Sequence, residues 1–224
     1  MQAAVQRAKI EAGQVNDVLI GNVLAELGFA KTGRMASNAA GFPNSTTFHT
    51  VNRQCSSSLQ AITHISHSIL AGQIDVGLGG GVESMSRNYG TRAIPVDVSP
   101  ELKESSVKDA RDCILPMLQT SENVASRYGI SRQEQDEFAA ESQRRASDAQ
   151  KSGRFDSELV PVQVRIVSEG IDEQSISVVE RDEGVRQNVT TQKLSTLKPV
   201  LENGFSTAGN SYVPLNLTPS RLRR

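Results

Sequence analysis

The first third of the chain alternates between apolar runs of strand length and stretches with helical spacing. Three runs rich in β-branched or other apolar side chains predict strands, at residues 17–23, 46–51 and 74–79. Composition or spacing predicts helices over residues 1–12, 33–40 and 59–70, with Gly13 and Gly72 placed to end the first and the last of these. Strands and helices in alternation are typical of a parallel sheet with crossover helices, so the sequence predicts an α/β fold.

The sequence becomes more polar over residues 87–205. Two prolines make residues 88–100 a predicted loop. Ser131 and Glu134 form a capping box, which predicts the start of a long, mostly charged helix. The predicted helices of this part cover residues 119–128, 132–151 and 190–197, and two half-exposed strands cover residues 160–166 and 176–178.

Cys55 stands between the second predicted strand and the helix that follows it. The first turn of a helix presents unpaired backbone N–H groups and the positive end of the helix dipole, which stabilise an anion such as a thiolate. The position therefore favours a reactive, nucleophilic cysteine. The alternative is a small buried cysteine that fills a gap in the core, and position by itself leaves both interpretations open.

Composition narrows the class of protein. The formal net charge is −1 and the isoelectric point is about 6.3, so nothing points to nucleic acid or an anionic membrane as a partner. No apolar run approaches the roughly 20 residues of a membrane span. Two cysteines do not form a disulfide framework, which favours a reducing compartment. We recognise no targeting signal at either end, including the Ser-Lys-Leu peroxisomal signal.

Four short motifs lie in order along the chain. They are Asn-Arg-Gln-Cys-Ser-Ser at 52–57 followed by Leu-Gln at 59–60; Gly-Gly-Gly-Val-Glu-Ser-Met-Ser at 79–86; Ala-Arg-Asp-Cys at 110–113 with Pro-Met at 116–117 and Thr-Ser-Glu-Asn-Val-Ala at 120–125; and Thr-Ala-Gly-Asn-Ser at 207–211. Their order and spacing resemble those of the thiolases, specifically the peroxisomal type of 3-ketoacyl-CoA thiolase.

The resemblance implies a thiolase-like α/β fold. Residues 1–86 would form the N-terminal parallel-sheet domain that carries the nucleophile, without the strand that normally opens it. Residues 87–205 would form an inserted loop domain that binds coenzyme A. Residues 206–224 would be a truncated junction and a disordered tail, with the C-terminal domain missing and an apolar face left uncovered; a functional tail is the alternative.

The resemblance also implies an acyltransferase of fatty-acid β-oxidation, of the acetyl-CoA C-acyltransferase type. Cys55 would carry the acyl group as a thioester, and Met117, Arg186 and Ala208 match positions that contact coenzyme A. Arg186 is nearly as well interpreted as an exposed charge in an acidic run. Acyl-CoA and coenzyme A are substrates, no bound cofactor or metal is implied, and the family implies a homodimer in the peroxisome.

Some of the family's chemistry has no counterpart here. The Gly-His-Pro and Asn-Glu-Ala-Phe motifs and the second, acid/base cysteine do not occur in these residues. The spacing of His49, His64 and His67 from Cys55 leaves none of them placed to take its proton. Cys113 is expected to be a spectator, with a disulfide to Cys55 as the minor alternative. We therefore expect no sustained turnover from this chain alone.

Three residues depart from the family's motifs: Ser58 and Leu118 stand where glycine is usual, and Tyr212 replaces a small serine. The Gly-Gly-Gly run at 79–81 lacks the features of a phosphate loop and is interpreted as a close backbone approach.

Two rival functions are kept. One is a condensing enzyme of the same superfamily, against which the segment 110–117 and the long insertion argue. The other is a non-catalytic truncated product that binds coenzyme A or a full-length subunit.

Overall fold

The structure, a computed structural model, describes residues 1–167 and 174–211. The chain divides into two compact units, the first formed by Met1–Val96 and the second beginning at Asp97. The departure noted at Tyr212 and the disordered tail expected after it lie outside the described residues.

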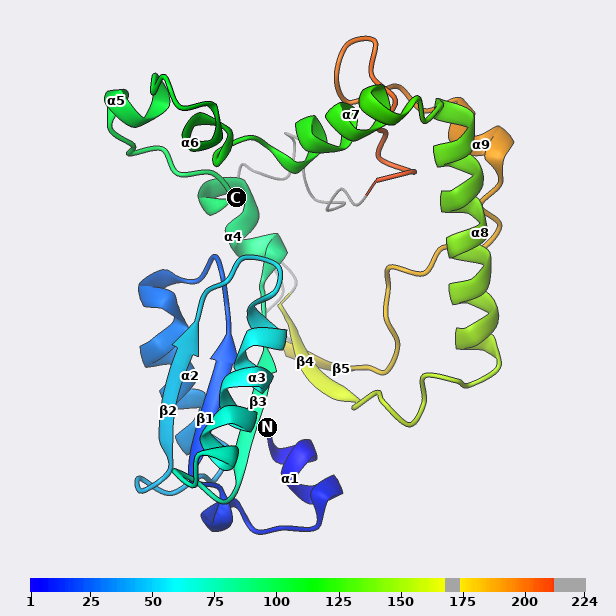
Figure 1. Cartoon of the computed structure of the whole chain (residues 1–224). Coiled ribbons are helices and arrows are strands. Elements are labelled where there is room, and N and C mark those ends of the chain that lie inside the picture. The colour runs from blue at the N-terminus through cyan, green and yellow to red at the C-terminus, as the bar shows by residue number, and fades with distance from the viewer. Residues whose placement is uncertain (168–173, 212–224) are drawn as a thin grey trace. The chain divides into compact units, whose positions relative to one another are not determined.

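The first unit is built on a three-stranded parallel sheet with the strand order β2-β1-β3 (Figure 1). The strands are β1 Asp17–Gly21, β2 Thr47–Val51 and β3 Gly77–Gly81. The register places Gly21, the last residue of β1, opposite Val51 and Gly81, so that all three strands end at the same edge. The predicted parallel α/β architecture is confirmed.

The central strand is buried on both faces, which explains why its sequence is an unbroken apolar run. Side chains alternate across a strand, and Val18 and Ile20 pack on one face with Val5, Val15 and Phe42. Leu19 points to the other face, where it contacts Ala61 and Ile65. The core of this unit therefore consists of two apolar clusters separated by the sheet.

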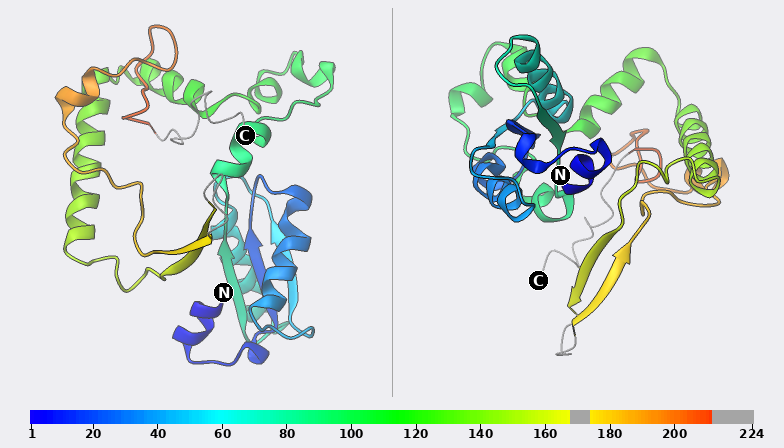
Figure 2. Two further views of the ribbon diagram at one scale, coloured as in Figure 1. Left: turned by 180° about the vertical axis from the view of Figure 1, so that it is seen from behind. Right: turned by 90° about the horizontal axis from the view of Figure 1, so that it is seen from below.

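Helices cover both faces of this sheet (Figures 1 and 2). The helical elements of the unit are α1 Gln2–Ala8, η1 Ala12–Gln14, η2 Glu26–Phe29, α2 Ala30–Ala39, α3 Ser57–Leu70 and α4 Met85–Arg92. Helix α3 packs on the face of Leu19, and α2 lies against β2, where Gly33 sits beneath the ring of Phe48.

Three sequence predictions in this unit need correction. The first helix ends at Ala8 rather than at Gly13, because Lys9 adopts a left-handed conformation. Strand β3 begins at Gly77 rather than at residue 74, because the preceding N–H groups donate to the side chain of Asn16. The loop predicted at 88–100 is helical at its start, in α4, where Arg92 donates to the carbonyl of Leu24 and pairs with Glu26.

Glycines let α3 approach the sheet very closely. A Cβ atom at Gly79 would lie 2.8 Å from the Cα atom of Ile62, and one at Gly21 would lie 2.4 Å from the carbonyl carbon of Ser57. Cβ atoms essentially never make contacts this short, so the backbone of α3 occupies the space that side chains would need. The close backbone approach predicted for the run 79–81 is confirmed at Gly79.

The outer side of α3 is apolar and exposed. Leu59, Ile62 and Ile69 are 66%, 52% and 42% exposed, and the helix contains no Asp, Glu, Lys or Arg. Solvated helices normally carry charged residues on their outer face. The outer side of α3 is therefore an exposed apolar surface.

The second unit consists of short helices, two long helices and a hairpin of strands. Its elements are α5 Pro100–Lys103, α6 Lys108–Asp112, α7 Met117–Tyr128, α8 Arg132–Lys151, β4 Val162–Val167, β5 Gln174–Val179 and α9 Thr191–Ser195. Strands β4 and β5 pair antiparallel and form a two-stranded ribbon (Figure 2). Helix α7 ends at a left-handed Gly129, and α8 begins with the capping box of Ser131 and Glu134, both as predicted. No helix of the described residues is long and apolar enough to cross a membrane.

Replacing Gly79 by alanine tests the contact between α3 and the sheet. Because the new Cβ would meet the backbone of Ile62, we expect Gly79→Ala to lower the free energy of unfolding by about 1–3 kcal/mol. The control is Gly13→Ala, where nothing lies within 4 Å of the added atom. Urea midpoints of both variants and the unaltered chain provide the measurement, and equal midpoints for the two variants would contradict the packing described.

Candidate active site

Cys55 lies at the edge of the sheet where the three parallel strands end. Strand β2 ends at Val51, and α3 begins at Ser57 with Ser56 as its N-cap, so Cys55 immediately precedes the helix cap. Its side chain is exposed and its thiol is free. The expected position just before the helix is confirmed, and exposure rules out the interpretation as a buried, gap-filling cysteine. Ligands of parallel α/β sheets bind at this edge.

The turn that carries Cys55 is held by hydrogen bonds from two side chains. Gln54 has a φ of 49°, a left-handed conformation that costs a non-glycine residue about 1–2 kcal/mol. Its N–H donates to Asn52 Oδ1 at 3.0 Å, and its carbonyl accepts from Ser57 Oγ at 2.6 Å. Ser57 Oγ also accepts from the N–H of Arg53 at 2.8 Å. These contacts provide hydrogen-bond partners for the N–H groups of Arg53 and Gln54 and for the carbonyl of Gln54.

The backbone N–H of Cys55 is left free. Within residues 1–167 and 174–211 it donates to no acceptor, while the N–H groups of Ser56 and Ser57 donate to the carbonyls of Arg53 and Gln54. An unpaired N–H beside an exposed thiol is a donor that can stabilise an oxyanion formed when the thiolate attacks a carbonyl.

Glu83 is a component of this edge that the sequence analysis left without a role. Its Oε2 atom accepts from the N–H groups of Val23 at 2.9 Å and Leu24 at 3.1 Å. The carbonyl of Val23 in turn accepts from Asn52 Nδ2 at 3.3 Å. Glu83 thus ties the loop after β1 to the loop after β3, and through Asn52 to the Cys55 turn. The only sequence signal was its place in the motif at 79–86.

Histidines are not associated with this site. His49 Nδ1 lies 3.3 Å from Asp17 Oδ1, so this imidazole already has a carboxylate partner. His64 and His67 are exposed on α3. Among the described residues no group of three or more His, Cys, Asp or Glu side chains is arranged to hold a metal ion.

The unusual Ser58 fits beside the sheet because its neighbour is a glycine. A Cβ atom at Gly81 would overlap the Ser58 hydroxyl, at 1.7 Å from Oγ. The Ser58 side chain therefore lies over the end of β3, three residues after Cys55 in the chain. Leu118, the second departure from the family's motifs, is half-buried in α7.

Met117, the first of the coenzyme A candidates, is the first residue of α7 and is 67% exposed. It lines a pocket of about 360 Å³ between α7 and the start of α8, together with Thr120, Ser121, Val124, Ala125, Ile130 and Gln135. The amide nitrogen of Gln135 is buried without a hydrogen-bond partner in the described structure. The pocket is therefore mostly apolar, with one donor that is not satisfied.

Ala208 is exposed on a turn that its neighbours hold in place. Thr207 Oγ1 accepts from the N–H groups of Gly209 and Asn210, and Asn210 Oδ1 accepts from the N–H of Thr207 at 2.7 Å. The small side chain of Ala208 is thus presented by a locally closed ring of hydrogen bonds.

Glu122 fixes this turn to helix α7. The carboxylate is buried and accepts from the N–H groups of Phe205 and Ser206, the latter at 2.7 Å from Oε1. The Ser206 hydroxyl lies 3.0 Å from that of Ser121, also on α7. Burial raises the pKa of Glu122, but the hydrogen bonds from Ser206 and Phe205 outweigh it and hold the pKa below its ordinary value. Met117 and Ala208 therefore belong to joined elements.

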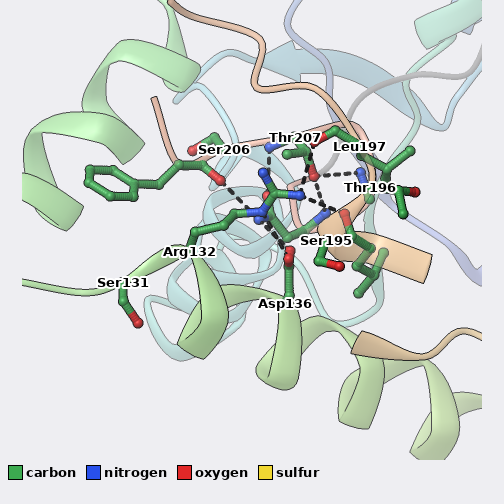
Figure 3. Close-up of polar contacts among 12 residues, drawn as sticks. Ser131, Arg132, Asp136, Ser195, Thr196, Leu197, Ser206 and Thr207 are labelled. Atoms are coloured by element: carbon green, nitrogen blue, oxygen red, sulfur yellow. Dashed lines mark hydrogen bonds and ion pairs between the residues drawn. The ribbon is translucent and has the colours of Figure 1, made fainter. Parts of the chain in front are cut away.

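Asp136 holds the other side of the same turn (Figure 3). It is 1% exposed and accepts from Arg132 Nε at 2.8 Å and from Asn210 Nδ2 at 2.9 Å. The Arg132 guanidinium also donates to the carbonyls of Leu194 and Leu197 at the end of α9. The buried charge is thus paired and hydrogen-bonded, as a buried carboxylate must be to be tolerated.

Arg186 lies apart from this network. Its backbone N–H donates to Gln143 Oε1 on α8 at 2.8 Å, and its side chain is exposed. Within the described residues the guanidinium forms no ion pair or hydrogen bond. It is an exposed surface charge that is accessible to a phosphate.

Cys113 is a different kind of thiol from Cys55. It is exposed and free, so no disulfide joins the two cysteines. It caps the C-terminal end of the five-residue helix α6, and its Sγ atom lies 3.2 Å from the carbonyl oxygen of Asp109. Cys113 thus lies at the C-terminal end of a helix, whereas Cys55 precedes an N-terminal end.

Comparison with known proteins agrees with this geometry. Residues 1–213 match the family model described as thiolase, N-terminal domain. The chain belongs to the thiolase family. It is 41% identical over 213 residues to the peroxisomal 3-ketoacyl-CoA thiolase of Yarrowia lipolytica, covering 94% of this chain and 50% of that protein. It is 44% identical over 212 residues to 3-ketoacyl-CoA thiolase A, peroxisomal, of Mus musculus, covering 94% and 49%.

Solved structures of thiolases share the fold. The dimeric peroxisomal thiolase of Saccharomyces cerevisiae matches with a TM-score of 0.78 at 38% identity, covering 92% of this chain and 50% of that one. The acetyl-CoA acetyltransferase of Bacillus anthracis matches with a TM-score of 0.77 at 33% identity, covering 94% and 54%. This thiolase chain therefore spans about half the length of the relatives that it matches.

The lowered pKa of Glu122 predicts a pH dependence of stability. A carboxylate with a depressed pKa in the folded state stabilises the fold above its ordinary pKa, and this contribution is lost as the pH falls through the lower pKa of the folded state. We expect Glu122→Gln to lower the urea midpoint at pH 7 and to flatten its decline toward pH 3. The control, Glu202→Gln at an exposed position, should follow the unaltered chain. Parallel pH profiles for Glu122→Gln and the unaltered chain would contradict the assignment.

The two thiols are predicted to differ in reactivity. Because Cys55 precedes the N-terminus of a 14-residue helix and Cys113 caps the C-terminus of a short one, iodoacetamide should modify Cys55 first near pH 7. Peptide mass spectrometry of the folded protein gives both rates in one experiment. Equal rates, or faster modification of Cys113, would reject the helix effect at Cys55.

Proposed function

We propose that this chain carries the nucleophile and the coenzyme A-binding elements of a 3-ketoacyl-CoA thiolase, an acetyl-CoA C-acyltransferase. The observation that carries the proposal is the exposed Cys55, with a free backbone N–H, directly before α3 at the carboxyl edge of a parallel sheet. The names of the relatives support the substrate class, 3-ketoacyl-CoA, and fatty-acid β-oxidation as the setting.

The reaction follows from a thiolate in this position. Cys55 Sγ attacks the 3-keto carbon of the substrate, and the keto oxygen takes the negative charge. The free N–H of Cys55 can donate to that oxyanion. Collapse of the adduct breaks the bond between carbons 2 and 3, which leaves the shortened acyl group on Sγ as a thioester. The departing enolate of acetyl-CoA takes up a proton, and the thiol of coenzyme A then accepts the acyl group.

Coenzyme A binding is assigned to residues 87–205 and the turn that follows, and the nucleophile to residues 1–86. Met117 beside the apolar pocket and Ala208 on its exposed turn suit the pantetheine chain, which is largely uncharged. Arg186, whose guanidinium has no partner in the described residues, suits a phosphate of the nucleotide end. Coenzyme A acts as a substrate in this scheme, and no metal is needed.

The full reaction also requires an acid/base for the enolate and for the coenzyme A thiol. The family's motifs for these groups do not occur in this sequence, and His49 is engaged with Asp17. Each missing oxyanion donor costs about 3–4 kcal/mol of transition-state stabilisation. The chain by itself should therefore stop at the acyl-enzyme.

A homodimer in the peroxisome is the assembly and location that we propose for the protein. A dimeric peroxisomal thiolase is among the structures that share the fold, and several similar proteins are named as peroxisomal.

The exposed apolar side of α3 favours one alternative function. A non-catalytic chain that binds coenzyme A or a full-length subunit would use the exposed apolar side of α3, formed by Leu59, Ile62 and Ile69. Exposed apolar patches commonly mark interaction surfaces. This alternative predicts binding without an acyl adduct. A condensing enzyme is less well supported, because the relatives are named as thiolases and as an acetyltransferase.

A stoichiometric assay separates these functions. On incubation with acetoacetyl-CoA, the chain should gain the mass of one acetyl group at Cys55 without sustained release of acetyl-CoA. Cys113→Ala should retain the adduct, and Cys55→Ala should lose it. An adduct that survives in Cys55→Ala would reject the proposal. Repeated turnover that depends on Cys55 would show that the chain contains a base at a site other than the histidines considered.

A further inference from the structure

The Cys55 turn adopts a conformation that its own sequence does not favour. Gln54 has a φ of 49° without being glycine, asparagine or aspartate, the residues that tolerate this region best. Such conformations persist only where surrounding contacts fix them, and they cluster at functional sites. In this turn the fixing contacts can be identified atom by atom.

Ser57 supplies the first of these contacts. It is 4% exposed, although serine at the start of a helix is usually solvated. Its hydroxyl donates to the carbonyl of Gln54 and accepts the N–H of Arg53, so both its donor and an acceptor position are used. Its backbone packs against Gly21 of the central strand, and this contact fixes the position from which the Ser57 side chain extends.

Asn52 supplies the second contact. Its Oδ1 atom accepts the N–H of Gln54, and its Nδ2 atom donates to the carbonyl of Val23. Val23 is itself held, because its N–H donates to Glu83. Asn52 is therefore anchored to the loops after β1 and β3, while its other end holds the turn.

We propose that Asn52 and Ser57 are positioning residues for Cys55. Together they hold Gln54 in its left-handed conformation, which keeps the thiol exposed and the Cys55 N–H free for one substrate geometry. The inference rests on the proposed function, since it specifies which residues fix the orientation of the Cys55 thiol. It assigns no direct contact with substrate to either residue.

Positioning can be separated from folding by comparing two reactions of the same thiol. Alkylation by iodoacetamide needs only an accessible thiolate. Acylation by acetoacetyl-CoA also requires that the 3-keto group of the substrate lie correctly between the thiol and the Cys55 N–H. In Asn52→Ala and Ser57→Ala we expect acylation to slow by about 10- to 100-fold, with alkylation within about threefold of the unaltered rate. Asn52→Asp keeps the acceptor for the Gln54 N–H but loses the donor to the Val23 carbonyl, so it should recover only part of the acylation rate.

Matched controls are Asn38→Ala on α2 and Ser66→Ala on α3, both at exposed positions outside the turn. Circular dichroism establishes that each variant is folded. If Asn52→Ala and Ser57→Ala acylate as fast as these controls, or if both reactions slow in parallel, positioning is rejected.

Amide hydrogen exchange tests the same contacts without any reaction. The Arg53 amide should lose protection selectively in Ser57→Ala, and the Gln54 amide in Asn52→Ala, with neither change in the controls. Unchanged protection would overturn the inference even if acylation were affected. If the unaltered chain forms no acyl adduct, the proposed function fails, and the exchange data still decide whether the two side chains hold the turn.

Discussion

The contact between α3 and the glycines of the sheet is the constraint on which the candidate active site depends. Gly21 and Gly79 have no side chains to separate the helix from the strands, so the helix backbone lies directly on them. A helix at this distance has its first turn beside the ends of all three strands. The Cys55 thiol, its free N–H and the loops joined by Glu83 are neighbours because of that approach. Larger side chains at these positions would move the helix and separate these groups.

Different kinds of contact hold the Cys55 turn in the first unit and the Ala208 turn in the second. The Cys55 turn is fixed mainly by side chains within five residues of it, Asn52 and Ser57, which act on adjacent backbone groups. The turn with Ala208 is fixed by two buried carboxylates, Glu122 and Asp136, that lie far from it in the sequence. The Cys55 turn therefore depends chiefly on local geometry, and the Ala208 turn depends on tertiary contacts.

This difference also explains what the sequence could predict. The parallel sheet, the position of Cys55 before its helix and the capping box of α8 were predicted, because each has a local pattern of spacing or capping. The start of β3 and the helix α4 were predicted wrongly. Both depend on partners about 60 residues away, Asn16 for the first and Glu26 and Leu24 for the second. The roles of Glu83, Glu122 and Asp136 were not predicted either, since a carboxylate gives no local sign of the distant N–H that it will accept.

The hydrogen bonds of Glu122 to Phe205 and Ser206 have a consequence for how the second unit assembles. They join positions 83 and 84 residues apart, and closing a loop of that length costs about 4 kcal/mol of chain entropy. A contact with this cost forms only after the helices on both sides of it can contribute their own stability. The turn that presents Ala208 is therefore one of the last parts of the unit to form during folding. By the same reasoning it is one of the first parts of the unit to open when the protein is heated or meets denaturant.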